Sequence, residues 1–316
     1  MILLLGATGL LGRNVLQLLL ERHIPVRALV RSALEVKGVE VVRGSLLSIE
    51  DLLSAAQGCC AIINCAGTTD MTLSRTEQFH PMNRDLPARL CQLLDACDIP
   101  VLIHVSTANT IASGTREHPA DESAPFGAPF DRGAYALSKR EGEKALLEYA
   151  RQHPQKRIVV LNPGFMIGGW DSKPSSGQLM LMGWKKRLML APCGGKSFLH
   201  VRDAATAIVN ALDGGEGRYL LTGDYLSLKD FYDLQARVMG YRQTCVTVPT
   251  WLMYPLGLLG NVLVKLGIRN QFFWNNLRQL TWEEWYDCSR ARKELKYPRT
   301  DLSEGIRDFF SWWTSR

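Results

Sequence analysis

A tyrosine and a lysine stand four residues apart in the stretch YALSK (135–139), and together they could move a proton. On a helix, Tyr135 and Lys139 share one face and lie one turn apart. A free phenol has a pKa of about 10, too high for an efficient base at neutral pH, and a neighbouring ammonium favours the phenolate. The pair also fits a ring in the core beside a lysine in solvent, so the rest of the chain must decide.

Three glycines with G-x-x-G-x-x-G spacing stand near the start of the chain, in GATGLLG. They follow the apolar run 2–5 and precede a helical pattern from Leu10 to about Glu21. A strand, a glycine turn and a helix in this order let the backbone approach a pyrophosphate at the amino end of the helix. The pattern predicts a dinucleotide site whose contacts are Gly6, Thr8, Gly9, Leu10, Leu11 and Gly12.

The end of the second expected strand, at 25–30, carries no acidic residue. An acid there would bind the adenosine ribose 2′-hydroxyl of NAD. Val30 takes that place instead, Arg31 follows it and Arg27 is nearby. Because a guanidinium can bind a 2′-phosphate with two hydrogen bonds, these residues favour NADP over NAD, although solvent-exposed arginines would look the same.

Strands and helices alternate through the first half of the chain. Short apolar runs at 2–5, 25–30, 39–42, 61–65, 101–105, 157–162 and 218–223 read as buried strands. Their alternation with helical patterns predicts an α/β fold, a Rossmann-type doubly wound parallel sheet.

The rhythm breaks after Pro163, resumes as a strand and a helix at 198–212, and turns mostly helical from about 227. We expect residues 1–165 plus 197–225 to form the dinucleotide-binding domain. Residues 166–196 plus 226–316 would form a smaller, mostly helical substrate lobe over the carboxyl ends of the strands.

Composition narrows the class of protein. The 316 residues are 46% hydrophobic and 22% charged, and the net charge of +6 is scattered, so nucleic-acid binding has no support. The eight cysteines form no Cys-x-x-Cys pair and no histidine has zinc-finger spacing, so we expect no metal and a reducing, cytoplasmic location. The start of the chain does not read as a signal peptide, and no run reaches the roughly 18 apolar residues of a transmembrane segment.

With these motifs in place, the chain resembles the extended short-chain dehydrogenase/reductases of the NAD-dependent epimerase/dehydratase family. Within them it looks most similar to the branch of 3β-hydroxysteroid dehydrogenases and dihydroflavonol 4-reductases. The resemblance covers nearly the whole chain and rests on the glycine loop followed in order by CAG (65–67), VSTANT (105–110), DES (121–123), YALSKREGE (135–143), NPGFMIG (162–168), FLHVRDAATA (198–207) and the final segment 289–313.

The resemblance implies catalytic roles for Thr107, Tyr135 and Lys139. Tyr135 would be the proton donor or acceptor, Lys139 would tune the phenol and hold the nicotinamide ribose, and Thr107 would orient the reacting oxygen. The family usually has a serine at the place of Thr107, and a threonine hydroxyl can make the same hydrogen bonds. A metal has no place in this set.

Further cofactor contacts follow from the same resemblance. The family often has an acid that contacts adenine after the third strand, where this chain has Gly44-Ser45-Leu46. A serine can still hydrogen-bond there, so the adenine site is weakened as an argument. The implied contacts are Arg31, Ser45, Leu46, Cys65, Ala66, Gly67, Asn83, Lys139, Pro163 and Gly164.

The expected reaction is hydride transfer between NADP(H) and a hydroxyl or carbonyl group. The apolar stretches 251–268 and 271–276 suit a hydrophobic substrate of sterol, flavonoid or terpenoid type. One alternative is a nucleotide-sugar epimerase or dehydratase, in which WKKR (184–187) would bind a diphosphate. Another is a non-catalytic NADP-sensing protein, against which the Thr/Tyr/Lys set argues.

Several residues have structural readings. Pro255, Gly257 and Gly260 interrupt the 251–268 stretch, so we expect helix packing within the lobe, with peripheral membrane contact as the lesser alternative. His104 reads as a core residue and Asp203 as a helix cap. By resemblance, a homodimer would form through helices near 84–98 and 134–151.

Overall fold

The structure of the chain is a computed structural model that describes residues 1–32, 34–172 and 175–316. Its largest element is a seven-stranded sheet in which every pairing is parallel. The strand order is β10 (Gly217–Leu221), β6 (Arg157–Pro163), β5 (Val101–Val105), β4 (Ala61–Asn64), β1 (Ile2–Leu5), β2 (Val26–Val30) and β3 (Val39–Arg43). This order confirms the predicted doubly wound fold, and the winding direction reverses between β1 and β4, where such folds bind dinucleotides.

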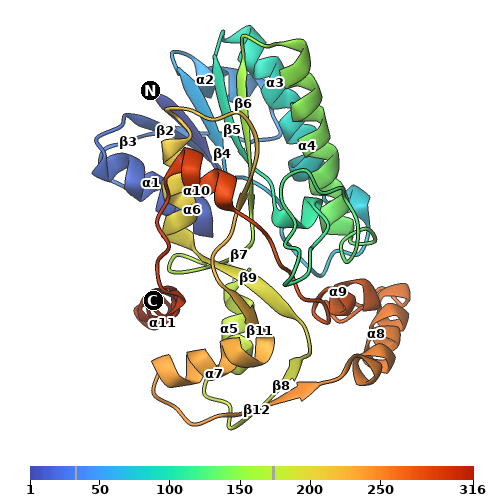
Figure 1. Cartoon of the computed structure of the whole chain (residues 1–316). Helices are drawn as coiled ribbons and strands as arrows, with labels where there is room; N and C mark the ends of the chain where they lie inside the picture. The colour runs from blue at the N-terminus through green and yellow to red at the C-terminus, as the bar shows by residue number, and fades with distance from the viewer. Residues whose placement is uncertain (33, 173–174) are drawn as a thin grey trace.

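Helices cover both faces of this sheet (Figure 1). One face carries α1 (Leu10–Glu21), α6 (Val201–Asn210) and α10 (Ser289–Leu295), and the other carries α2 (Ile49–Ala56), α3 (Leu86–Ala96) and α4 (Ala134–Gln152). Successive strand residues point to opposite faces, so Leu4 and Ile63 pack against α1 and α6, whereas Leu3 and Ile62 pack against α2 and α3. The strands are therefore buried on both sides, as their continuous apolar runs predict.

The smaller lobe contains two small sheets as well as helices. One sheet has the order β11 (Tyr225–Ser227), β9 (Gly195–His200) and β7 (Phe165–Ile167), and the other pairs β12 (Thr244–Val248) with β8 (Leu188–Pro192) in parallel. The lobe's helices are α5 (Gly177–Gly183), α7 (Leu228–Val238), α8 (Thr250–Lys265), α9 (Trp274–Gln279) and α11 (Leu302–Thr314). Phe198, Phe231 and Phe309 lie at its core.

Two expectations need correction here. The strand expected from 198 lies in the small sheet beside β7 rather than in the seven-stranded sheet. Asp203 does not cap α6, because His200 takes that position and its Nδ1 accepts a hydrogen bond from the Arg202 N–H at 3.0 Å. The Asp203 carboxylate instead accepts hydrogen bonds from the backbone and hydroxyl of Thr300, which tie the segment before α11 to α6.

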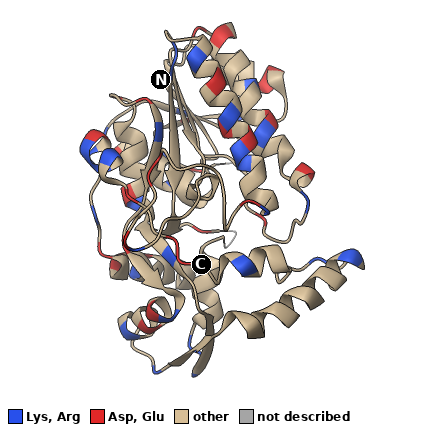
Figure 2. Ribbon diagram, turned by 45° about the vertical axis from the view of Figure 1, so that its right-hand side comes forward, with Lys and Arg blue, Asp and Glu red and all other residues tan. Residues whose placement is uncertain are grey.

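Charged residues are frequent on most helices of the molecule but rare on α8. Figure 2 shows basic and acidic residues along the helices that cover the sheet, whereas the long helix at the lower right is almost entirely tan.

None of the helices in the described part of the chain has the length and hydropathy that crossing a bilayer requires.

Candidate active site

The glycine loop lies between β1 and α1, and its three glycines have different reasons to be glycine. Gly6 has φ +83°, and a Cβ there would lie 2.7 Å from the backbone nitrogen of Ala66. A Cβ on Gly12 would lie 2.0 Å from the Gly6 carbonyl oxygen. A Cβ on Gly9 would meet only that oxygen, at 3.6 Å. The fold therefore requires Gly6 and Gly12, whereas Gly9 leaves room for a ligand.

The amino end of α1 has the features of an anion-binding site. Gly9 is its N-cap without a side-chain hydrogen bond, and its first turn holds no acidic residue. Thr8 and Gly9 are exposed, while Leu11 and Gly12 are buried behind the loop. Backbone N–H groups at a helix start have no partner within the helix, so they can bind a pyrophosphate. These residues fit the expected dinucleotide.

The two arginines on β2 have different surroundings. Arg27 faces Glu40 on β3, with its Nε 2.7 Å from Oε1, and its Nη1 donates to the carbonyls of Ala55 and Gln57. Arg27 therefore fastens the sheet to α2 and is not available to a cofactor. Arg31 follows the carboxyl end of β2 and is exposed.

The turn after β3 is shaped by its own hydrogen bonds. The Ser45 N–H donates to Oδ2 of Asp51 at 2.7 Å, and its hydroxyl accepts from the Leu47 N–H at 3.1 Å. Leu46 packs against the core between the sheet and α2. The side chains of Ser45 and Leu46 thus have structural partners, and a cofactor contact at this turn stays a prediction.

The loop after β4 is held by an asparagine. Asn83, fully buried in the π-helical turn η2 (Pro81–Asp85), accepts from the Thr68 N–H at 2.9 Å and donates to the Thr68 carbonyl and the Ser138 hydroxyl. Its amide is therefore used within the protein, and it positions the loop. A Cβ on Gly67 would lie 2.8 Å from Nζ of Lys139, so only glycine leaves space for that ammonium.

Beside this loop, Cys65 is half-buried, and burial raises the pKa of its thiol to about 12. Behind it, His104 on β5 is buried and lies 3.0 Å from the Asn64 amide, and burial lowers its pKa well below the ordinary value. His104 is a neutral core residue, as expected.

Tyr135 and Lys139 lie on α4, and Thr107 lies just after β5, which confirms the helix and the shared face. Thr107 and Tyr135 line the same cavity and interact through their side chains. Burial raises the Tyr135 pKa to about 12 and Thr107 partly opposes this rise, so burial, rather than the expected ammonium, dominates. Lys139 is 4% exposed and donates to the Val105 carbonyl at 3.0 Å, and burial lowers its pKa to about 8.

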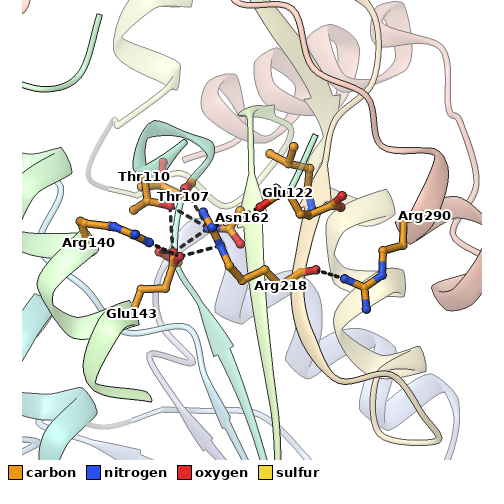
Figure 3. Close-up of polar contacts among 10 residues, drawn as sticks. Thr107, Thr110, Glu122, Arg140, Glu143, Asn162, Arg218 and Arg290 are labelled. Carbon is orange, nitrogen blue, oxygen red and sulfur yellow. Dashed lines mark hydrogen bonds and ion pairs between the residues drawn. The ribbon is translucent and has the colours of Figure 1, made fainter. Parts of the chain in front are cut away.

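A buried polar network lies behind these residues (Figure 3). The Glu143 carboxylate, fully buried, accepts 2.8 Å hydrogen bonds from the Ser106 hydroxyl, the Thr110 hydroxyl and the Asn162 amide. Its Oε1 lies 2.8 Å from Nε of Arg218, on β10. The network joins α4 to strands β5, β6 and β10.

The same network fixes the place of Thr107. The Asn162 amide donates to the Thr107 carbonyl at 3.1 Å, and so does the Thr110 hydroxyl at 3.0 Å. Sequence reasoning missed this network, although one signal was present. Glu143 is four residues beyond Lys139, so Tyr135, Lys139 and Glu143 lie on one face of α4.

A cavity of about 290 Å³ opens beside Tyr135. Leu10, Thr107, Tyr135 and Gly164 line it from the sheet side, so it gathers one residue from each of four predicted site segments. The Pro163 ring, buried in β6, is not part of the lining. Arg31 and Ser45 are not part of it either, because they follow β2 and β3 at one edge of the sheet. The lobe supplies apolar walls: Phe165, Met166, Leu179, Met182, Phe272, Leu277 and Leu280.

An ion pair and several uncharged polar side chains, among them Gln178, Asn276 and Gln279, interrupt these apolar walls. Lys196 and Glu284 are 6% and 4% exposed, and the ammonium of Lys196 contacts the Glu284 carboxylate and the Gln279 carbonyl. Burial raises the pKa of Glu284, and Lys196 opposes that rise. Within the described lining, Lys196 is the one basic side chain, and its charge is balanced.

The fold is that of dinucleotide-dependent enzymes of the short-chain dehydrogenase/reductase type. The glycine loop and the arrangement of Thr107, Tyr135 and Lys139 agree with this class. A model of the NAD dependent epimerase/dehydratase family matches residues 2–220. The chain belongs to this family.

Relatives of similar length carry the names of reductases and of a sterol-modifying protein. A protein of Synechocystis sp. named as a dihydroflavonol 4-reductase is 27% identical, over 97% of this chain and 92% of its own. Sterol demethylase protein B of Methylococcus capsulatus is 25% identical, over 99% and 98%. The 2-alkyl-3-oxoalkanoate reductase of Shewanella oneidensis is 25% identical, over 96% and 83%.

Solved structures share the fold over almost the whole chain. The structure of gox2253 has a TM-score of 0.86 at 24% identity, covering 99% of this chain and 98% of that one. UDP-glucose 4-epimerase of Thermus thermophilus, solved with NAD, has a TM-score of 0.79 at 18% identity, with the same coverage. At such identities these structures establish the architecture alone.

Proposed function

We propose that the protein transfers a hydride between NADP(H) and a carbonyl or hydroxyl group on a mainly apolar small molecule. The observation that carries this proposal is the cavity, in which Thr107 and Tyr135 meet walls of leucine, methionine and phenylalanine. Most of the accessible surface of this cavity is apolar, and polar side chains such as Asn109, Gln178 and Asn276 interrupt it, an arrangement typical of sites that orient a hydrophobic ligand.

The proton chemistry follows from the pKa of the phenol. When bound, the dinucleotide supplies or accepts the hydride. Tyr135, with its pKa raised to about 12, carries its proton at neutral pH, so it can donate that proton to the oxygen of a carbonyl being reduced. The Thr107 hydroxyl holds the same oxygen in place.

Lys139 is the third residue of the proposed Thr–Tyr–Lys site. It is fixed between Gly67 and the Val105 carbonyl, next to the loop expected to hold the nicotinamide ribose. We expect its buried ammonium to stabilise negative charge on the phenol after the proton has left.

NADP is favoured by Arg31 alone, since Arg27 is committed to Glu40. Arg31 is exposed where the second strand ends, the position at which this fold meets the adenosine ribose. A guanidinium there suits a 2′-phosphate.

A nucleotide-sugar substrate has less support. Lys185, Lys186 and Arg187, which would have bound its diphosphate, are exposed and lie outside the cavity lining. Within the described lining, Lys196 is the remaining basic group and is paired with Glu284. The reductase names of the Synechocystis and Shewanella relatives agree with the preferred reaction.

The test is NADPH oxidation with a panel of apolar ketones and nucleotide sugars. We expect turnover with apolar ketones, and a loss of at least about 100-fold in kcat for Tyr135→Phe with NADPH affinity retained. Tyr149→Phe, which removes a hydroxyl from the far end of the same helix, should leave kcat unchanged. Turnover of nucleotide sugars alone, or a Tyr135→Phe variant within a few-fold of wild type, would overturn the proposal.

A further inference from the structure

Helix α8 is attached to the lobe by one narrow face. Met253, Gly257 and Gly260 are buried, and their spacing places them on one side of the helix. A Cβ on Gly257 would lie 2.9 Å from the ring of Trp274, and one on Gly260 would lie 2.4 Å from the Phe272 carbonyl oxygen. The glycines therefore let α8 approach the segment that leads into α9.

The rest of α8 is exposed although it is apolar. Trp251 is 72% exposed, Leu259 is 56% exposed and Leu266, just after the helix, is 70% exposed. The expectation that this stretch packs within the lobe therefore holds only for its glycine face. A helix on a water-facing surface normally turns polar residues outward. Here the outward residues also include Leu252, Tyr254, Leu256, Leu258 and Val262.

The exposed apolar area continues onto the neighbouring small sheet. Leu188 and Leu190 on β8 are 58% and 59% exposed, and Val246 on β12 is 46% exposed. Strand β12 ends at Val248, two residues before α8 begins. We call the exposed apolar residues of α8, Leu266, β8 and β12 together the apolar surface. Monomeric proteins seldom expose so many large apolar side chains in one region.

The apolar surface reaches the cavity. Phe272 and Met182 line the cavity and are also 41% and 38% exposed. Phe272 lies against Gly260 of α8, and Met182 belongs to the helix that precedes β8. These two side chains therefore connect the cavity lining with the solvent-exposed apolar side chains beside the apolar surface.

The segments that supply this surface carry charge of one sign, while Asp230 and Asp233 of α7 lie near Cys245 on β12. Residues 172–202 and 234–282, which supply the whole apolar surface, contain no Asp or Glu. The exposed basic residues Lys185, Lys186 and Arg187 directly precede β8, and Lys265 ends α8. In Figure 2 the long helix at the lower right shows blue but no red. Three other basic residues of the two ranges are paired with acids: Lys196 with Glu284, Arg269 with Asp70 and Arg278 with Asp131.

We propose that the apolar surface lies on an anionic membrane, with α8 in the headgroup layer and the basic residues against lipid phosphates. Apolar side chains with a basic border are what such an interface attracts. A second copy of the chain fits less well, since a symmetric pairing of this surface would bring basic residues against basic residues. Resting on the proposed function, the arrangement lets an apolar substrate enter the cavity directly from the lipid.

Vesicle flotation of the full chain tests the proposal. The probes are vesicles of phosphatidylcholine alone and of phosphatidylcholine mixed with phosphatidylglycerol. We expect the protein to float with the mixed vesicles and much less with the neutral ones. Changing Trp251→Ser, Leu259→Gln and Leu266→Gln together should weaken partition about 100-fold. The paired control, Val41→Gln with Leu47→Gln, alters two exposed apolar residues elsewhere and should float like wild type.

A second pair of variants tests the basic border, formed by Lys185, Lys186, Arg187 and Lys265. Lys185→Gln with Lys186→Gln should weaken binding to mixed vesicles several-fold, while Lys144→Gln with Lys293→Gln, which removes the same charge elsewhere, should not. Circular dichroism confirms that every variant is folded. Wild-type protein that stays unbound with both vesicle types, or a triple variant that floats normally, overturns the proposal. So does a triple variant that changes the oligomeric state in sedimentation without changing flotation.

Turnover of a water-soluble ketone without vesicles separates this proposal from the proposed function. Turnover without flotation would contradict the membrane proposal but not the proposed function. Flotation without turnover of any ketone would contradict the proposed function but not the membrane proposal.

Discussion

Glu143 and Arg218 form an ion pair behind Thr107, with Oε1 and Nε 2.8 Å apart. The carboxylate is fully buried and also receives hydrogen bonds from Ser106 and Asn162. Because a buried charge is costly without its partners, Glu143 ties α4, which carries Tyr135, to β10 through Arg218 and to the end of β5 through Ser106. Tyr135 and Thr107 are therefore both positioned through one shared anion.

Replacing Glu143 tests that arrangement. Glu143→Gln keeps the shape but leaves the Arg218 guanidinium without its anion, so the free energy of unfolding should fall by about 3–5 kcal/mol. Urea denaturation at neutral pH measures the loss. Glu148→Gln, an exposed position of the same helix, should cost less than about 1 kcal/mol. Adding Arg218→Met to Glu143→Gln should recover part of the loss, and a Glu143→Gln protein as stable as wild type would contradict the ion pair's role.

The glycine loop gives a prediction with an internal control. Gly12→Ala places a Cβ 2.0 Å from the Gly6 carbonyl oxygen, so we expect a protein that fails to fold or loses several kcal/mol of stability. Gly9→Ala has room within the protein and ordinary backbone angles, so it should fold normally. It should nevertheless weaken NADPH binding at least about 10-fold, because the methyl group occupies space for the pyrophosphate.

Fluorescence titration with NADPH and thermal unfolding of both glycine variants provide the measurements. Normal NADPH affinity in Gly9→Ala would show that the cofactor does not approach this residue.

The buried ammonium of Lys139 should make stability depend on pH. Its pKa is lowered to about 8 in the folded chain, whereas an unfolded lysine titrates near 10.5. Between these values the unfolded chain holds more protons, so the unfavourable contribution is complete below about pH 8 and disappears as the pH rises toward 10.5. Lys139→Met should therefore be more stable than wild type at pH 7, by up to about 3 kcal/mol, and this advantage should shrink at pH 10.

Urea denaturation of both proteins at pH 7 and pH 10 gives the comparison. Lys144→Met, at an exposed position of α4, should show no such change with pH. An advantage of Lys139→Met that grew with pH would contradict the sign derived from burial.

Cofactor preference should depend on Arg31. Arg31→Ala removes a charged hydrogen-bonding group from the end of β2, so the Kd for NADP(H) should rise about 10-fold or more while that for NAD(H) stays constant. Arg27→Met should lower stability, because it frees Glu40 and the Ala55 and Gln57 carbonyls, without changing the ratio of the two affinities. Isothermal titration with both dinucleotides distinguishes the two arginines, and equal effects on NADP and NAD in Arg31→Ala would refute the assignment.

The fold of the sheet could be predicted because buried parallel strands are continuous apolar runs separated by helical patterns. Of the strands in the lobe, β9 was expected from residue 198, whereas β7, β8, β11 and β12 could not be predicted. In β8, exposed Leu188 and Leu190 alternate with buried Met189 and Ala191, yet all four are apolar, so the period of two that identifies a half-buried strand is invisible. The exposure of these leucines depends on the surroundings of the finished lobe.

For the site, the shared face of Tyr135 and Lys139 followed from spacing alone, whereas the roles of Arg27 and Glu143 did not. Arg27 is assigned by sheet register, since β2 and β3 pair Arg27 with Glu40. Glu143 resembles a charge on a solvated helix face until β10 brings Arg218, 75 residues later, beside it. Both roles arise from contacts between segments that a single sequence does not bring together.

The order of the segments also constrains how the chain folds as it is synthesised. The lobe elements from β7 to β9 emerge between β6 and β10, and α6, which covers α1 behind the glycine loop, emerges after them. A nascent chain ending before α6 would leave the side of α1 that packs against α6 uncovered. We therefore expect the growing chain to become competent for the nucleotide late, after much of the lobe has been translated, and to need protection from aggregation until then.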